Sequence, residues 1–204
     1  MSGAAPMQFV PTLPPEEVAR ANFYGLLARL LYAPPDTELL RTLAISGELD
    51  AEDGGGIALA WRELARAAAA ADPEGVRDEY ESTFVSVGKA PITLYTSAYS
   101  VRYTNETPLV ALRSDLAGYG IARRSEAGEP EDHIAALFEV MRYLIAEKRQ
   151  TLEEQRRFFE RWIWPTVQPL CAAIRTSEKT AFYKTVGAFL LELCTLEHEA
   201  FEML

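Results

Sequence analysis

The sequence predicts an all-α protein, folded as a single globular bundle of about eight to nine helices. Apolar residues recur at three- and four-residue spacing along almost the whole chain, which is the period of a helix with one buried face. Of the 204 residues, 49% are hydrophobic and 25% are charged, a balance typical of a globular domain with its own core. No segment of about 20–50 residues repeats, which argues against a solenoid.

Each predicted helix is bounded by residues that start or stop helices. Proline pairs lie on both sides of the first one, and Asp36, Asp72 and Thr151 stand where a side chain can cap a helix N-terminus. The predicted helices cover about 16–33, 36–43, 57–71, 73–87, 108–119, 130–148 and 152–164, followed by a short one that holds Leu170 and Ile174 and a long last one capped by Thr176-Ser177. The 130–148 helix has the strongest apolar stripe, formed by Ile134, Leu137, Phe138, Met141, Leu144 and Ile145. The apolar positions of the last helix are Phe182, Val186, Phe189, Leu193, Leu196 and Ala200.

The segment from Gly88 to Thr107 lacks a helical period. Its tyrosines would suit strands, but an isolated hairpin is marginal in a helical protein. We therefore expect an ordered connection with a helical turn after Ser97. For the whole chain we expect a flexible N-terminal segment over 1–14 and one helical domain over 15–204, as a monomer or as a dimer that swaps helices about a hinge at 120–129.

Charge and targeting signals narrow the class of partner. Thirty acidic and twenty basic side chains give a formal charge of −10, which argues against nucleic acid and suits a basic peptide. Cys171 and Cys194 form no CxxC pair, which favours a reducing compartment. Residues 1–15 contain no Lys or Arg and no apolar run, and nowhere do about 18 apolar residues follow one another. We expect a cytoplasmic protein without a membrane span.

The usual signatures of catalysis and of bound metal are missing. The chain has no GxxxxGK[ST], GxGxxG or GxSxG motif. A di-iron bundle needs Glu-x-x-His pairs, but Pro130 precedes His133 by three residues and Thr195 precedes His198 by three. With two histidines and two distant cysteines, a zinc site is improbable. We expect no metal, no cofactor and no enzymatic activity.

One cluster, Glu129-Pro-Glu-Asp-His133, allows two interpretations. A proline at the first helical position with acids in the first turn is ordinary helix-start chemistry. Alternatively, His133 borders a groove one turn before Leu137, and the neighbouring acids raise its pKa and provide acceptors for a basic ligand. Five acids and no Lys or Arg lie between Ser125 and Glu139, which is a solvated face or half of a site for an arginine-bearing peptide.

A second candidate region is rich in aromatic residues. Tyr80 and Phe84 are four residues apart on a predicted helix and are more typical of the core. Tyr95 and Tyr99 lie in a predicted loop, where aromatic residues commonly line a recognition surface.

Together these segments resemble the TorD/DmsD/NarJ family, whose members are cytoplasmic chaperones for molybdenum-containing redox enzymes. The resemblance runs from about Pro15 to the end of the chain. Its motifs, in chain order, are Tyr80-x-x-x-Phe84-Val85, Pro91, Tyr95-Thr-Ser97-Ala-Tyr99, Glu129-Pro-Glu-Asp132-His133-Ile134, Phe159 to Trp164, Pro169-Leu-Cys171 and Ala181-Phe-Tyr183.

The resemblance implies an all-α, TorD-like fold that binds the twin-arginine leader of a molybdopterin-dependent apoenzyme and delays its export until the cofactor is inserted. It also implies the peptide-binding residues. Those carried over are Asp132, His133, Tyr80, Thr83, Phe84, Tyr95, Ser97 and Tyr99.

Charge complementarity adds an acidic rim to this groove. We expect Glu129, Glu131 and Asp132 to meet the leader's arginines, while its apolar middle packs on the aromatic residues. Some relatives write the motif as Pro-Asp-His, whereas Glu131 intervenes here, and some have tryptophan near the position of Tyr80. These departures leave the client enzyme open.

Two alternatives come from other functional classes. In an enzyme, His133 would be a general base oriented by Asp132, but neighbouring helical residues point about 100° apart and make a poor dyad. Guanine nucleotides have been linked to some relatives, yet the chain has no phosphate-binding loop motif. The other alternative is a helical interaction module without a redox-enzyme client.

Overall fold

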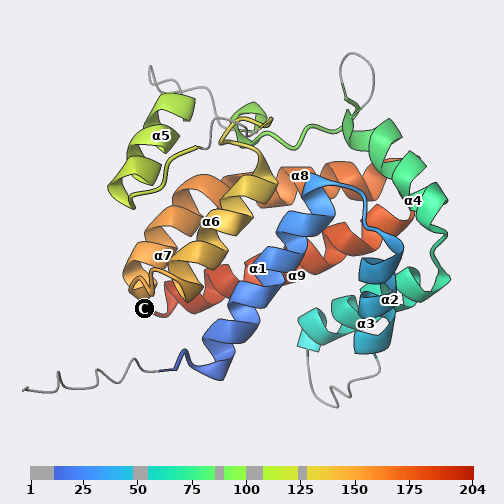
Figure 1. Cartoon of the computed structure of the whole chain (residues 1–204), viewed down its shortest axis with the longest axis horizontal. Helices are drawn as coiled ribbons and strands as arrows, with labels where there is room; N and C mark the ends of the chain where they lie inside the picture. Colours follow the sequence, from blue (N-terminus) through green and yellow to red (C-terminus); the bar gives the residue numbers. More distant parts are fainter. Residues whose placement is uncertain (1–11, 48–54, 86–89, 100–107, 124–127) are drawn as a thin grey trace, which may run out of the picture.

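Helices form nearly all of the regular structure in a computed structural model that describes residues 12–47, 55–85, 90–99, 108–123 and 128–204 (Figure 1). This confirms the all-α prediction. Over those residues, no helix is both long and apolar enough to cross a bilayer. The α-helices are α1 Pro15–Tyr32, α2 Thr37–Ser46, α3 Gly55–Ala70, α4 Pro73–Tyr80, α5 Pro108–Gly118, α6 Ile134–Ala146, α7 Leu152–Phe158, α8 Trp164–Thr176 and α9 Phe182–Glu202, with π-helical segments η1 Glu81–Val85 and η3 Phe159–Ile163 and a 3₁₀ turn η2 Thr96–Ala98.

The core lies between α1, α6 and α9. α1 packs along α6, α3 and α8 pack against α9, and α2 covers α3, so that α2 and α3 lie at one end of the molecule and α5 at the other (Figure 1). The apolar stripe predicted for α6 is confirmed, because all its members are fully buried. They are Ile134, Leu137, Phe138, Met141, Leu144 and Ile145.

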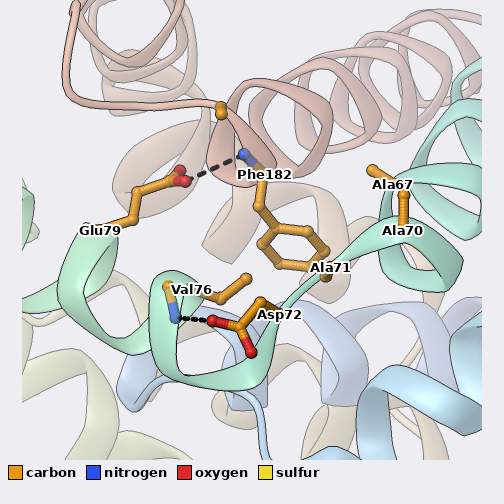
Figure 2. Close-up of a pocket in the computed structure, with 9 residues that line it drawn as sticks. Ala67, Ala70, Ala71, Asp72, Val76, Glu79 and Phe182 are labelled. Atoms are coloured by element: carbon orange, nitrogen blue, oxygen red, sulfur yellow. Dashed lines mark hydrogen bonds between the residues drawn. The ribbon is translucent and has the colours of Figure 1, made fainter.

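The predicted local caps are also confirmed. Asp36 accepts a hydrogen bond from the N–H of Leu39 at 2.7 Å, and Asp72 accepts one from Gly75 at 3.0 Å (Figure 2). Thr151 does the same for the N–H of Glu154 at 3.3 Å. Each cap satisfies a backbone donor that has no partner within its own helix.

The start of α9 differs from the prediction. α8 continues through Thr176, and α9 begins only at Phe182. Its first N–H groups are capped by Glu79 of α4, whose carboxylate accepts from Phe182 at 3.1 Å (Figure 2) and from Tyr183 at 2.7 Å. The prediction was wrong because the capping carboxylate comes from a distant helix.

The far end of α9 corrects a second prediction. The apolar spacing predicts Leu196 and Ala200 on its buried face, but both are exposed, and Glu197 and Phe201 are buried instead. Glu197 is tied down by Arg20 of α1, with N–O distances of 2.7 Å. The pairing allows a carboxylate to occupy an interior position that an apolar residue would normally take.

Helical winding changes but does not stop at Trp164-Pro165. The π-helical segment η3 leads directly into α8, and Pro165 lies in the first turn of α8. Because proline has no backbone N–H, one helical hydrogen bond is missing there, at the point where π-helical winding gives way to α-helical winding.

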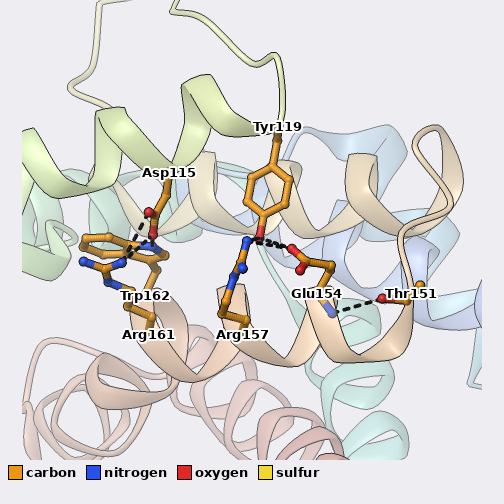
Figure 3. Close-up of polar contacts among 7 residues, drawn as sticks. All are labelled: Asp115, Tyr119, Thr151, Glu154, Arg157, Arg161 and Trp162. Carbon is orange, nitrogen blue, oxygen red and sulfur yellow. Dashed lines mark hydrogen bonds and ion pairs between the residues drawn. The ribbon is translucent and has the colours of Figure 1, made fainter.

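Polar contacts hold α5 against α7 and η3 (Figure 3). Asp115 accepts hydrogen bonds from the indole N–H of Trp162 at 2.8 Å and from Arg161 at 3.0 Å. The hydroxyl of Tyr119 donates to Glu154 at 3.2 Å. α5 ends as predicted near Gly120, whose φ of +70° suits glycine.

Candidate functional site

A loop and the start of α6 meet in an isolated antiparallel bridge between Tyr95 and His133. The N–H of Thr96 donates to the carbonyl of Asp132 at 2.9 Å, and the N–H of Ile134 donates to the carbonyl of Leu94 at 2.8 Å. We call residues 94–97 together with 129–134 the Asp-His corner. The corner joins two of the segments that the sequence singled out.

The bridge shifts the start of α6. The predicted helix began at Pro130, with acids in its first turn, but α6 begins at Ile134, and Pro130 to Asp132 form a turn. His133 is the N-cap, with an extended backbone (φ −65°, ψ 128°). The Leu94 carbonyl and the His133 side chain satisfy the N–H groups of Ile134 and Ala135, so the helix start is set from outside the local sequence.

His133 is buried and neutral. The residue is 5% exposed, and its Nδ1 accepts the N–H of Ala135 at 3.2 Å, which assigns the ring proton to Nε2. Burial lowers the pKa of His133, although the charges of Glu129 and Asp132 oppose the shift. The expectation that neighbouring acids would raise this pKa was therefore wrong, because desolvation is the larger effect.

Two tyrosines flank the His133 ring. Tyr95 and Tyr32 both lie edge-on to it, with centroid distances of 5.4 and 6.3 Å. The Tyr95 hydroxyl donates to Glu129, and this bond raises the pKa of Tyr95 to about 12. Tyr32 is 60% exposed at the end of α1. The predicted site does not include Tyr32, for which the available signal is an aromatic residue at the end of the first helix, two residues before Pro34-Pro35.

The acids of the corner have partners within the chain. Asp132 is buried, and its carboxylate accepts the N–H of Ser97 at 3.4 Å in the turn η2. Glu131 accepts two hydrogen bonds from Arg113 of α5, at 2.9 and 3.1 Å. The guanidinium holds the pKa of Glu131 below its ordinary value. One acid of the predicted rim, Glu131, is thus already paired with an arginine of the same chain.

These contacts also bear on the enzyme alternative. Nδ1 of His133 faces Ala135, and the Asp132 carboxylate faces Ser97. A general-base dyad needs a hydrogen bond between the imidazole and the carboxylate that orients it. The described geometry gives the two side chains separate structural roles instead.

The helical aromatic residues lie beneath the corner. Tyr80, Thr83 and Phe84 are 5%, 0% and 8% exposed, and the rings of Tyr80 and Phe84 pack on Tyr183. The hydroxyl of Tyr80 contacts the last carbonyls of α1, with 2.8 Å to that of Tyr32. These three residues support the loop from below. Their contact with a peptide stays a prediction.

The loop connects this buried layer to the surface. The N–H of Ile92 donates to the carbonyl of Thr83 at 3.1 Å, and Tyr99 is half-buried, with its hydroxyl donating to Thr93 at 2.8 Å. Ser97 is exposed. The structure therefore brings the three predicted segments together in two layers, with Tyr32, Tyr95, Ser97, Glu129 and Glu131 at or near the surface.

The chain belongs to the nitrate reductase delta subunit family. The model of that family matches residues 50–172, which is more than half of the chain and includes the Asp-His corner. This confirms the resemblance to the TorD/NarJ family.

Individual proteins also resemble this chain, among them the following two. The chaperone protein TorD of Photobacterium profundum is 27% identical over 125 residues, which are 56% of this chain and 58% of the relative; the chain thus spans little more than half the length of that relative. A crystal structure from Archaeoglobus fulgidus, described as a redox enzyme maturation protein, has a TM-score of 0.53 at 16% identity, with 92% of this chain and 98% of that chain covered. The second likeness shows a shared fold.

Proposed function

We propose that this protein is a cytoplasmic chaperone that binds the N-terminal, twin-arginine leader of a molybdenum-containing oxidoreductase subunit. It holds the apoenzyme back from export until the molybdopterin cofactor is inserted, and it performs no catalysis itself. Membership of the family and the similarity to a TorD chaperone support the maturation role. The resemblance in the Asp-His corner supports the leader as the ligand.

The main structural support is the pair formed by Arg113 and Glu131. A bidentate guanidinium–carboxylate contact already exists beside the corner, so the geometry there accepts an arginine. A leader arginine that displaces Arg113, or that pairs with Glu129, makes the same kind of contact. Because His133 is neutral, it adds no positive charge that would repel a cationic leader.

Apolar surface lies next to these acids. Tyr32 is largely exposed and Tyr95 partly so, and both rings stand on edge against His133. We propose that the apolar middle of the leader packs on these rings, since aromatic residues give large contact areas at low entropic cost.

The test is the affinity of a synthetic twin-arginine leader for variants that keep the helix caps. His133→Asn keeps a side-chain acceptor at the N-cap of α6, and Asp132→Asn keeps an acceptor for the N–H of Ser97. Glu129→Gln removes one charge from a side chain that is not buried. We expect Glu129→Gln to weaken leader binding about tenfold, because it removes one charge-assisted hydrogen bond. A leader with two lysines should bind weakly to the parent, because lysine makes no bidentate contact.

Glu139→Gln is the matched control, since Glu139 is an exposed acid on α6 that pairs with Arg142. It should bind the leader like the parent. Equal affinity for the parent and all three corner variants would contradict this placement of the site.

Co-purification from the native host separates the chaperone from a general helical interaction module. A molybdoenzyme subunit should be retained with its leader intact and lost when the leader is deleted. If the subunit were retained equally with and without its leader, the proposed function would be overturned.

A further inference from the structure

We propose that Glu160, His198 and Glu202 form a binding site for one divalent transition-metal ion, with Zn²⁺ as the reference ion. Each side chain offers one ligand atom, and these atoms all lie within 4.8 Å of one another. We call these residues the His198 cluster. It lies where η3 meets the C-terminal end of α9, and it is independent of the proposed leader site.

Ligand spacing in the cluster is close to that of a metal site. Ligand atoms of a tetrahedral Zn²⁺ site lie roughly 3.3 Å apart, given metal–ligand bonds near 2.0–2.2 Å. Nδ1 of His198 and Oε1 of Glu160 are 2.7 Å apart. An ion between them replaces their shared proton and needs only a small separation. Glu202 is exposed, so its carboxylate can rotate inward without disturbing the core.

The backbone places the three ligands on facing surfaces. His198 and Glu202 are four residues apart on α9 and therefore share one helix face. Glu160 lies on η3, a π-helical segment, and such segments re-aim side chains and often occur at functional sites. The Trp164 ring stacks on the His198 ring at 4.2 Å and 18°. This stacking fixes the plane of the imidazole and thus the direction of its lone pair.

The charge of the cluster suits a divalent cation. Two carboxylates, together with an imidazole that ligates metal in its uncharged form, provide two negative charges. Three arginines line the same pocket as Glu160 and Glu202, and two of them are paired with acids outside the cluster, which offsets their charges. They are Arg156 with the carbonyl of Phe201, Arg157 with Glu154, and Arg161 with Asp115.

The ligand set favours transition metals over Mg²⁺ or Ca²⁺. Those hard ions prefer all-oxygen sites, whereas an imidazole with carboxylates suits Zn²⁺, Ni²⁺, Co²⁺ or Cu²⁺. An ion bound here links the end of α9 to η3. Because this arrangement exists only in the folded chain, binding raises the unfolding temperature.

The experiment is a titration of the full, chelator-treated protein with Co²⁺, followed by displacement with Zn²⁺. We expect one Co²⁺ per chain, with visible absorption of a low-symmetry site and partial quenching of the tryptophan fluorescence, to which Trp164 beside His198 contributes. Zn²⁺ should reverse both signals. Glu160→Gln and Glu202→Gln should each lower the affinity for the ion at least about tenfold, since even the loss of a group that only orients a metal ligand has such an effect.

Glu199→Gln is the matched control, because Glu199 is an exposed acid on α9 outside the cluster. It should bind like the parent. Zn²⁺ should raise the unfolding temperature of the parent and of this control by the same amount, and that of each cluster variant by less. Absence of saturable binding, or equal binding by parent and cluster variants, would overturn the proposal and leave His198 and Glu160 as a hydrogen-bonded pair.

Discussion

The two histidines of the chain have opposite environments. His133 is buried at the start of α6, where its Nδ1 caps the helix and two tyrosines approach its ring edge-on. His198 lies inside α9 with 28% of its side chain exposed, stacked flat on Trp164 and bonded to Glu160. The comparison shows that neighbours, and not residue type, decide what an imidazole does.

The difference has a direct chemical consequence. The Nδ1 lone pair of His133 already accepts the N–H of Ala135. This ring therefore adds an uncharged aromatic surface to the Asp-His corner. The bond of His198 to a carboxylate can open to admit an ion, because both partners reach solvent. Loss of the two rings should therefore have effects of different kinds and sizes.

The largest effect is expected from His133→Ala. Loss of an N-cap costs about 0.5–2 kcal/mol, and the buried ring leaves a cavity as well, so we expect a stability loss of about 2 kcal/mol. In metal-free buffer, His198→Ala should change the free energy of unfolding by less than about 1 kcal/mol. Urea denaturation of both variants measures the contrast, and equal losses would refute it.

Glu79→Ala tests a cap that comes from another helix. Its carboxylate accepts the N–H groups of Phe182 and Tyr183 at the start of α9. We expect a loss of about 1–2 kcal/mol, similar to that of a local cap. The neighbouring exposed acid Asp78 provides the control, and thermal or urea unfolding of Asp78→Ala should stay within about 0.5 kcal/mol of the parent.

The pH dependence of stability isolates His133. Its folded-state pKa is below the unfolded value of about 6.5, so the unfolded chain binds more protons just below this pH. Stability is therefore complete above the unfolded-state pKa and falls as the pH decreases towards the folded-state pKa. His133→Asn keeps the cap but does not titrate. Urea midpoints from about pH 7.5 to about pH 5.5 should decline less steeply for this variant, and identical slopes would contradict the assignment.

The smallest effect is expected at Arg113, which pairs with Glu131 at the edge of the corner. Arg113→Ala releases that carboxylate for a leader arginine, so leader affinity should rise, by no more than about fivefold for an exposed pair. Arg66→Ala breaks a surface ion pair with Glu63 on α3, away from the corner, and should leave affinity unchanged. Weaker binding by Arg113→Ala would show that Arg113 assists the leader.

Local sequence patterns determined most of the helical framework. The spacing of apolar residues predicted the buried stripe of α6, and Asp36, Asp72 and Thr151 marked helix starts correctly. In these cases the interacting groups lie within one or two turns of each other. Residue type and spacing are then enough to predict the contact.

Only the tertiary structure decided the remaining features, because their partners are distant in the chain. Pro130 and His133 are both plausible helix starts, and the choice depends on the carbonyl of Leu94. The His198 cluster was invisible to a search for Glu-x-x-His pairs, since Glu160 joins it from 38 residues away. Burial likewise lowers the pKa of His133, although the charges of its acidic neighbours act in the opposite direction. Tertiary packing determines which atoms come into contact and how far each group is removed from water. Neither can be read from residues that are close in the sequence.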